Sequence, residues 1–82
     1  MRGMGMNLAN AIDAVITEYG RACAYNATFN SAHEGFAVLL EEVDELKAEV
    51  WKKRTCRDMD LMRREAIQVA AMALRFLTDV KG

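Results

Sequence analysis

The chain contains no proline, and its glycines lie close to the two ends apart from Gly20 and Gly35. Proline and glycine are the residues that interrupt helices most strongly. Long stretches of this chain therefore lack helix breakers, and apolar residues recur in them with helical spacing. The sequence contains no internal repeat and no low-complexity segment. We expect an all-α protein with one domain covering residues 1–82.

Three helices are predicted, over about residues 7–25, 31–54 and 58–80. Asn7 is a suitable N-cap for the first helix. Ser31 and Glu34 form the capping-box pattern at the start of the second helix, with a hydroxyl at the N-cap and a carboxylate three residues later. The polar segment TCRD separates the second helix from the third. Short links therefore join the three helices.

The third predicted helix is apolar on nearly all sides between residues 66 and 77. A helix of this kind in a water-soluble protein is buried on more than one side. Three helices in a chain of 82 residues do not easily provide that cover. We expect a second copy of the chain to provide it, which gives a four-helix-bundle core in a homo-oligomer, either a dimer or a tetramer.

The overall composition excludes several classes of protein. Hydrophobic residues make up 52% of the chain and charged residues 28%, with a net charge of −1. These values predict a globular protein that does not bind duplex nucleic acid. Asn7, Asn10 and Asp13 interrupt the N-terminal apolar stretch, so no signal peptide and no membrane span are expected. Cys23 and Cys56 are expected to be packed or free thiols in a cytoplasmic protein.

The second predicted helix has an apolar side and an acidic side. The apolar side is the expected core face and carries Phe36, Leu39, Leu40, Val43, Leu46 and Val50. The acidic side carries Glu34, Glu41, Glu42, Glu45 and Glu49. Like charges four residues apart repel one another by a few tenths of a kcal/mol each. The acids either form a solvated face screened by salt or hold a divalent cation.

A metal site needs carboxylates that converge, and two helices supply candidates for one. Glu42 and Glu45 are three residues apart, a spacing that places both side chains on one side of a helix. On the third helix, Glu65 and Gln68 lie on the side expected to face the interior. A buried carboxylate requires a cation. That cation is either Arg75 or a metal ion shared with Glu42 and Glu45.

Two segments carry a resemblance to a known family: EEVDE at residues 41–45 and REAIQVAAMALRF at residues 64–76. Together they resemble the MazG-like nucleotide pyrophosphohydrolases of the all-α NTP pyrophosphatase superfamily, whose signature is E-E-x-x-E on one helix and E-x-x-D on the next. The resemblance implies that Glu42, Glu45 and Glu65 are metal ligands and that Glu41 supports them. Gln68 stands where the family usually has Asp, and its amide oxygen would be the fourth ligand.

The activity implied by the resemblance is hydrolysis of a nucleoside triphosphate between its α and β phosphates, with Mg²⁺ as cofactor and Mn²⁺ as a substitute. The metal would neutralise phosphate charge and lower the pKa of an attacking water. Glu41 or Glu34 would accept the proton of that water. The alternative, suggested by Gln68, is a helical oligomer without catalytic activity that binds nucleotides or another protein.

Five further residues are candidates for substrate binding: Asn30, His33, Lys52, Lys53 and Arg75. Lys52 and Lys53 would meet phosphates, although cations at the end of a helix are also favoured by its dipole. His33 would touch a base, or it is a surface residue. Asn30, with Tyr25 and Phe29 in the same linker, would bind a nucleobase or cover the end of the bundle.

Overall fold

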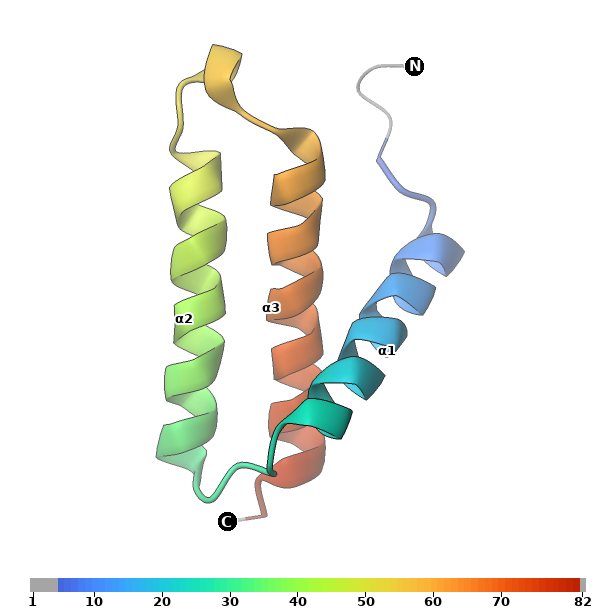
Figure 1. Ribbon diagram of the computed structural model, residues 1–82, viewed down its shortest axis with the longest axis vertical. Coiled ribbons are helices and arrows are strands. Elements are labelled where there is room, and N and C mark those ends of the chain that lie inside the picture. The colour runs from blue at the N-terminus through green and yellow to red at the C-terminus, as the bar shows by residue number, and fades with distance from the viewer. Residues whose placement is uncertain (1–4, 82) are drawn as a thin grey trace.

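The computed structural model describes residues 5–81, which form three α-helices and one short 3₁₀ helix (Figure 1). The helices are α1 (Leu8–Tyr25), α2 (Ala32–Val50), η1 (Arg54–Cys56) and α3 (Met59–Asp79). Residues 5–81 contain no strand, which confirms the all-α prediction. The predicted domain also includes residues 1–4 and 82, which lie outside the described residues. No helix in the described range is both long and apolar enough to cross a membrane.

Side-chain caps fix the start of each α-helix. The Asn7 carboxamide oxygen accepts a hydrogen bond from the Asn10 amide at 2.8 Å, and the Ser31 hydroxyl accepts one from the Glu34 amide at 3.1 Å. The Asp58 carboxylate accepts hydrogen bonds from two amides in the first turn of α3. These caps satisfy amides that have no partner within a helix. The predicted helix starts are therefore confirmed.

The predicted end of the second helix, at about Arg54, is wrong. α2 ends at Val50, and Trp51 is its C-cap residue, with a backbone N–H that bonds to the carbonyls of Lys47 and Glu49. The Arg57 guanidinium then donates to the Val50 carbonyl at 3.0 Å. A basic side chain at a helix C-terminus satisfies a carbonyl that the helix leaves open. α2 therefore ends at Val50, because the Arg57 side chain takes the place of the backbone N–H that a further turn would supply to the Val50 carbonyl.

α3 is the central element of the fold. Helix contacts within residues 5–81 join α3 to α2 on one side and to α1 on another. In Figure 1, α2 and α3 run antiparallel side by side, and α1 crosses α3 obliquely near the C-terminal end of α3. Burial of α3 on more than one side is therefore confirmed. α1 and α2 of the same chain provide part of this cover. The expectation that a second copy supplies the rest stays a prediction.

The buried core lies where the linker between α1 and α2 meets the C-terminal half of α3. It consists of Ala22, Phe29, Ala71 and Met72. Gly35 allows α2 to approach this core closely, because a Cβ atom there would lie 2.9 Å from the Phe76 ring and 3.0 Å from the Phe29 ring. These distances are shorter than van der Waals contact between carbons. A glycine at this position therefore brings the start of α2 against α3.

The predicted core face of α2 is only partly buried. Leu39, Leu46 and Val50 are half-buried, whereas Phe36 is 58% exposed and Leu40 and Val43 are also exposed. The reason is that α3 contacts a neighbouring side of α2, on which Val38 and Leu39 pack against the core. The prediction that Phe36, Leu40 and Val43 are core residues is therefore wrong for a single chain.

Candidate functional site

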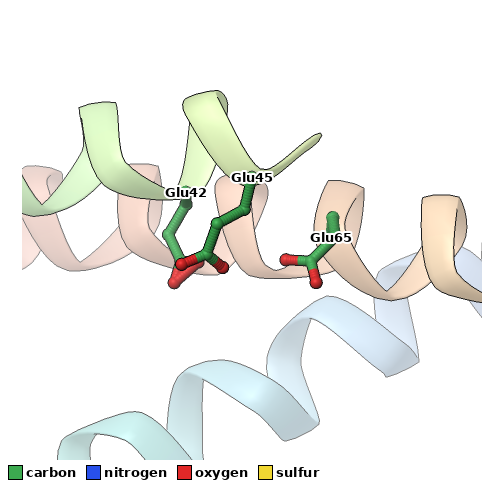
Figure 2. A group of neighbouring side chains, drawn as sticks. All are labelled: Glu42, Glu45 and Glu65. Atoms are coloured by element: carbon green, nitrogen blue, oxygen red, sulfur yellow. The ribbon is translucent and has the colours of Figure 1, made fainter. Parts of the chain in front are cut away.

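Three carboxylates from two helices converge between α2 and α3. Glu42 and Glu45 extend from α2, and Glu65 extends from α3 (Figure 2). Each residue offers one oxygen, and these three oxygens lie within 4.8 Å of one another. The convergence arises because Glu42 and Glu45 share one side of α2, and the antiparallel hairpin places the first half of α3 opposite the second half of α2. We refer to these three residues as the carboxylate cluster.

Among the described residues, no ion pair with a cation is found at the carboxylate cluster, although the charge of Arg64 acts to lower the pKa of Glu65. One oxygen of Glu42 (Oε2) and one of Glu65 (Oε1) are buried without a hydrogen-bond partner among the described residues. Burial raises the pKa of Glu42, and the charges of Glu45 and Glu65 raise it further. Burial is also the main cause that raises the pKa of Glu65, followed by the charge of Glu45 and a hydrogen bond to it. Mg²⁺ and Mn²⁺ prefer oxygen ligands, so converging carboxylate oxygens without hydrogen-bond partners are suitable ligands for either ion.

Arg75 does not neutralise Glu65, so that interpretation is wrong. Arg75 is only 3% exposed, and its Nη2 donates to the Ala27 carbonyl at 2.7 Å. Its guanidinium lies 3.6 Å from the Asp79 carboxylate and stacks 4.3 Å from the centre of the Phe29 ring. These contacts hold Arg75 against the linker that precedes α2. Of the two cations considered for Glu65, Arg75 is thus engaged elsewhere, and a metal ion shared with Glu42 and Glu45 stays a prediction.

A cavity of about 550 Å³ lies beside the carboxylate cluster, between α1, α2, α3 and the linker that joins α1 to α2. Glu42 belongs both to the cavity lining and to the cluster, and Gln68 lies in the lining only. The apolar residues of the lining include Ala22, Phe29, Val38 and Met72. The polar residues include Asn26, Thr28, Asn30, Glu34 and Arg75. The volume is within the range of small-molecule sites. The structure therefore places a ligand-sized space next to three converging carboxylates.

The two candidates for the general base occupy different positions. Glu34 lines the cavity, and its carboxylate accepts a hydrogen bond from the Asn30 amide at 2.6 Å. This bond joins the linker to the first turn of α2, in the manner of a capping box that reaches one residue further back. Glu41 is exposed and is absent from the lining, although its charge contributes to the raised pKa of Glu42.

The five candidate substrate-binding residues also separate into two groups. Asn30 and Arg75 line the cavity, whereas His33, Lys52 and Lys53 do not. Lys52 forms an ion pair with Glu49 at 2.8 Å, and Lys53 lies at the start of η1. In the same linker as Asn30, Phe29 is buried in the core, as expected for a residue that covers the end of the bundle, whereas Tyr25 is exposed.

Two functional candidates on α1, Glu18 and Arg21, were missed in the sequence. Both line the cavity, and Glu18 also lines a smaller one together with Gln68. Arg21 donates two hydrogen bonds to Glu18, from Nε at 3.0 Å and from Nη2 at 2.7 Å. A pair three residues apart on a helix has the pattern of a solvated surface pair. The sequence feature that could have identified Glu18 is its spacing from Val15 and Ala22, which places it on the apolar side of α1 and therefore towards the interior.

No family model, no curated protein and no solved structure matches this chain. The carboxylate cluster, the adjacent cavity and the spacing of the acids in the sequence are therefore the observations that bear on function.

Proposed function

We propose that this protein is a MazG-like nucleoside triphosphate pyrophosphohydrolase that depends on Mg²⁺ and also accepts Mn²⁺. Its substrate would be a ribonucleoside or deoxyribonucleoside triphosphate, and water would convert it to the monophosphate and pyrophosphate. The observation that carries the proposal is the carboxylate cluster, in which three oxygens from Glu42, Glu45 and Glu65 lie within 4.8 Å of one another. Two of these side chains have buried oxygens without a hydrogen-bond partner in residues 5–81.

Glu42, Glu45 and Glu65 are the residues that would hold the metal, with the Gln68 amide oxygen as a further ligand. When bound, the ion supplies charge neutralisation for the phosphates and lowers the pKa of a coordinated water. The chain's own contribution is a set of carboxylates with raised pKa values at Glu42 and Glu65, which gain most from a nearby cation. Gln68 lines the cavity beside Glu42, a position from which its amide would orient substrate or metal.

The cavity would bind the nucleotide, because it opens beside Glu42 and has both apolar and amide-bearing walls. Asn30 would hydrogen-bond to the substrate through its side chain, and Arg75 would act by holding the linker in place. Glu34 is the general base that we favour over Glu41, since Glu34 lines the cavity and Glu41 is exposed outside it. Lys52, Lys53 and His33 would contribute only through contacts outside this cavity.

The test is pyrophosphate release from a panel of ribonucleoside and deoxyribonucleoside triphosphates, with Mg²⁺ and with chelator. We expect Mg²⁺-dependent release from the wild type and a loss on the order of 10²-fold or more in Glu45→Gln, the scale for removal of an electrostatic catalytic group. Asp44→Asn is the matched control, because Asp44 is the exposed neighbour of Glu45 and lies outside the cluster. We expect this variant to keep wild-type activity.

The alternative function is a nucleotide-binding or interaction module without turnover, and the neutral Gln68 in the cavity is the observation that favours it. Absence of pyrophosphate release across the whole panel, from a folded protein that still binds Mg²⁺, would support this module and exclude the hydrolase. Release that survives in Glu45→Gln would instead remove the role of the carboxylate cluster.

We also propose that the protein is a cytoplasmic homo-oligomer, either a dimer or a tetramer, with a four-helix-bundle core. Large apolar side chains are exposed on α2 at Phe36 and Leu40 and on α1 at Leu8, Ile12 and Ile16. A groove between α1 and α3 has an entirely apolar lining that includes Ile12 and Ile16. Extended apolar surfaces of this kind mark interfaces. Sedimentation of the wild type as a monomer at micromolar concentration would contradict this proposal.

A further inference from the structure

The cavity wall formed by α1 contains an accessible cation. Arg21 lines the cavity that also contains Glu42 and Gln68, and its side chain is 58% exposed. The other cation in this lining is Arg75, which is buried and donates to the Ala27 carbonyl. Lys52 and Lys53 do not line the cavity. Among the described cavity residues, Arg21 is therefore the cationic group that a ligand can reach.

The present partner of Arg21 has the geometry of a phosphate contact. Nε and Nη2 of Arg21 donate to the two oxygens of Glu18, at 3.0 and 2.7 Å. A guanidinium binds carboxylate and phosphate oxygens with the same two-pronged arrangement. Ion pairs of this kind with an exposed partner add little to stability. The pair can therefore exchange one anion for another at small cost.

The charge balance of the cavity also requires such a contact. Glu18, Glu34 and Glu42 all line it, so a nucleotide that enters meets three carboxylates. A bound metal ion at the carboxylate cluster would offset part of this repulsion. A cation on the opposite wall would offset more of it and would fix the direction of the phosphate chain.

We propose that Arg21 binds the phosphate chain of the nucleotide and exchanges its hydrogen bonds to Glu18 for bonds to phosphate oxygens. The identity of the ligand rests on the proposed function, but the binding itself requires no hydrolysis. Glu18 orients the guanidinium until the nucleotide arrives, which makes Glu18 a positioning residue.

The experiment is titration calorimetry with Mg²⁺ and the α,β-methylene analogues of ATP, GTP, CTP and UTP, which cannot be cleaved at the bond in question. We expect Arg21→Gln to weaken binding of the preferred analogue by about 10-fold or more, since it removes hydrogen bonds to a charged group. Arg21→Lys keeps the charge but loses the two-pronged contact, so it should have an intermediate affinity. Lys47→Gln is the control, because it removes the same charge from an exposed position outside the cavity.

The outcomes separate this inference from the proposed function. Binding by Arg21→Gln that equals the wild type, an equal loss in Lys47→Gln, or no binding by the wild type would overturn the role of Arg21. Binding that depends on Arg21, without any pyrophosphate release, would retain that role and reject the hydrolase. Circular dichroism verifies that each variant keeps its helices. If Arg21→Gln does not fold, the affinity of Arg21→Lys tests the role of Arg21 instead.

Discussion

Two groups of charged side chains lie along the α2–α3 hairpin, and they differ in the partners that the chain gives them. Near the C-terminal end of α3, Arg75 has the Ala27 carbonyl, the oppositely charged Asp79 carboxylate and the Phe29 ring as partners, and its Nε is buried without a hydrogen-bond partner among the described residues. Near the start of α3, Glu65 meets Glu42 and Glu45, and both Glu42 and Glu65 keep a buried oxygen without a hydrogen-bond partner. One group is neutralised from within residues 5–81, and the other consists of like charges.

This difference indicates that the carboxylate cluster, and not the Arg75 group, requires a ligand. A buried charge without a partner is costly, and proteins usually avoid it except at functional sites. The linker supplies a carbonyl and an aromatic ring to Arg75, and Asp79 supplies the opposite charge. Within residues 5–81, the carboxylate cluster has no ion pair of this kind, and two of its buried oxygens have no hydrogen-bond partner. Substitutions in the two groups should therefore change stability with opposite signs.

The largest expected effect is at Arg75, whose charge is neutralised by Asp79. Arg75→Met keeps an apolar chain of similar length but leaves Asp79 and the Ala27 carbonyl without the guanidinium. Loss of one partner from a buried ion pair typically costs about 3–5 kcal/mol. We expect the free energy of unfolding, measured by urea denaturation with chelator present, to fall by that amount.

Lys47→Gln is the matched control for Arg75→Met, because it removes a cation from an exposed position on α2. It should change the free energy of unfolding by no more than about 0.5 kcal/mol. A loss below about 1 kcal/mol in Arg75→Met would mean that the Arg75 contacts contribute little, and the contrast between the two groups would disappear.

The second prediction has the opposite sign. Glu65→Gln removes one of the mutually repelling charges at nearly constant shape, so the protein in chelator should become more stable by about 1 kcal/mol. This change corresponds to a rise of roughly 4–8 °C in the melting temperature for a domain of this size. Differential scanning calorimetry on both proteins provides the measurement. A lower melting temperature in Glu65→Gln would show that the carboxylate is already satisfied by the chain.

The same variant should lose its response to metal. A ligand that binds only the folded state at 100 times its dissociation constant stabilises by about 2.7 kcal/mol. We expect a shift of this order for the wild type in Mg²⁺ and little shift for Glu65→Gln. Asp44→Asn serves as the control here as well, since Asp44 is exposed and is not part of the carboxylate cluster. Its response to Mg²⁺ should equal that of the wild type.

The helices were predictable because their start signals are local. Asn7, Ser31 and Asp58 each cap a helix through amides two or three residues away, and such signals are visible in the sequence. The end of α2 was not predictable, because the donor to the Val50 carbonyl is Arg57, which follows a 3₁₀ turn. The burial of α3 on more than one side was predictable from its apolar surface. The exposure of Phe36 and Leu40 was not predictable, because an apolar side of a helix does not identify which element packs against it.

The candidate site was predictable where its residues lie on one helix or carry a motif. The spacing of Glu42 and Glu45 and the inward position of Glu65 led to a group that the structure brings together. Of the two alternatives for the cation near Glu65, Arg75 was wrong, because its Ala27 carbonyl partner belongs to a linker whose path is set only by tertiary packing. Arg21 was missed for a related reason, since the crossing of α1 over α3 decides which side of α1 meets the cavity.

The smallest expected effect is the pH dependence of stability in chelator. The pKa values of Glu42 and Glu65 are raised above their ordinary value of 4.5, mainly by burial. The native state therefore binds more protons than the unfolded state between that value and the raised pKa values, so the free energy of unfolding decreases as the pH rises through this window. The contribution of these two groups to the free energy of unfolding should be largest at the acidic end of the window and should fall towards neutral pH. We expect the melting temperature to follow the same trend.

Glu42→Gln/Glu65→Gln should flatten this decrease, because neither position then titrates. Mg²⁺ should oppose it in the wild type, since a metal binds the deprotonated carboxylates and its stabilising effect grows with pH. The two melting curves, with chelator and with Mg²⁺, should therefore diverge as the pH rises. Parallel curves, or a decrease that persists in the double variant, would place the titrating groups outside the carboxylate cluster and would remove the contrast with the Arg75 contacts.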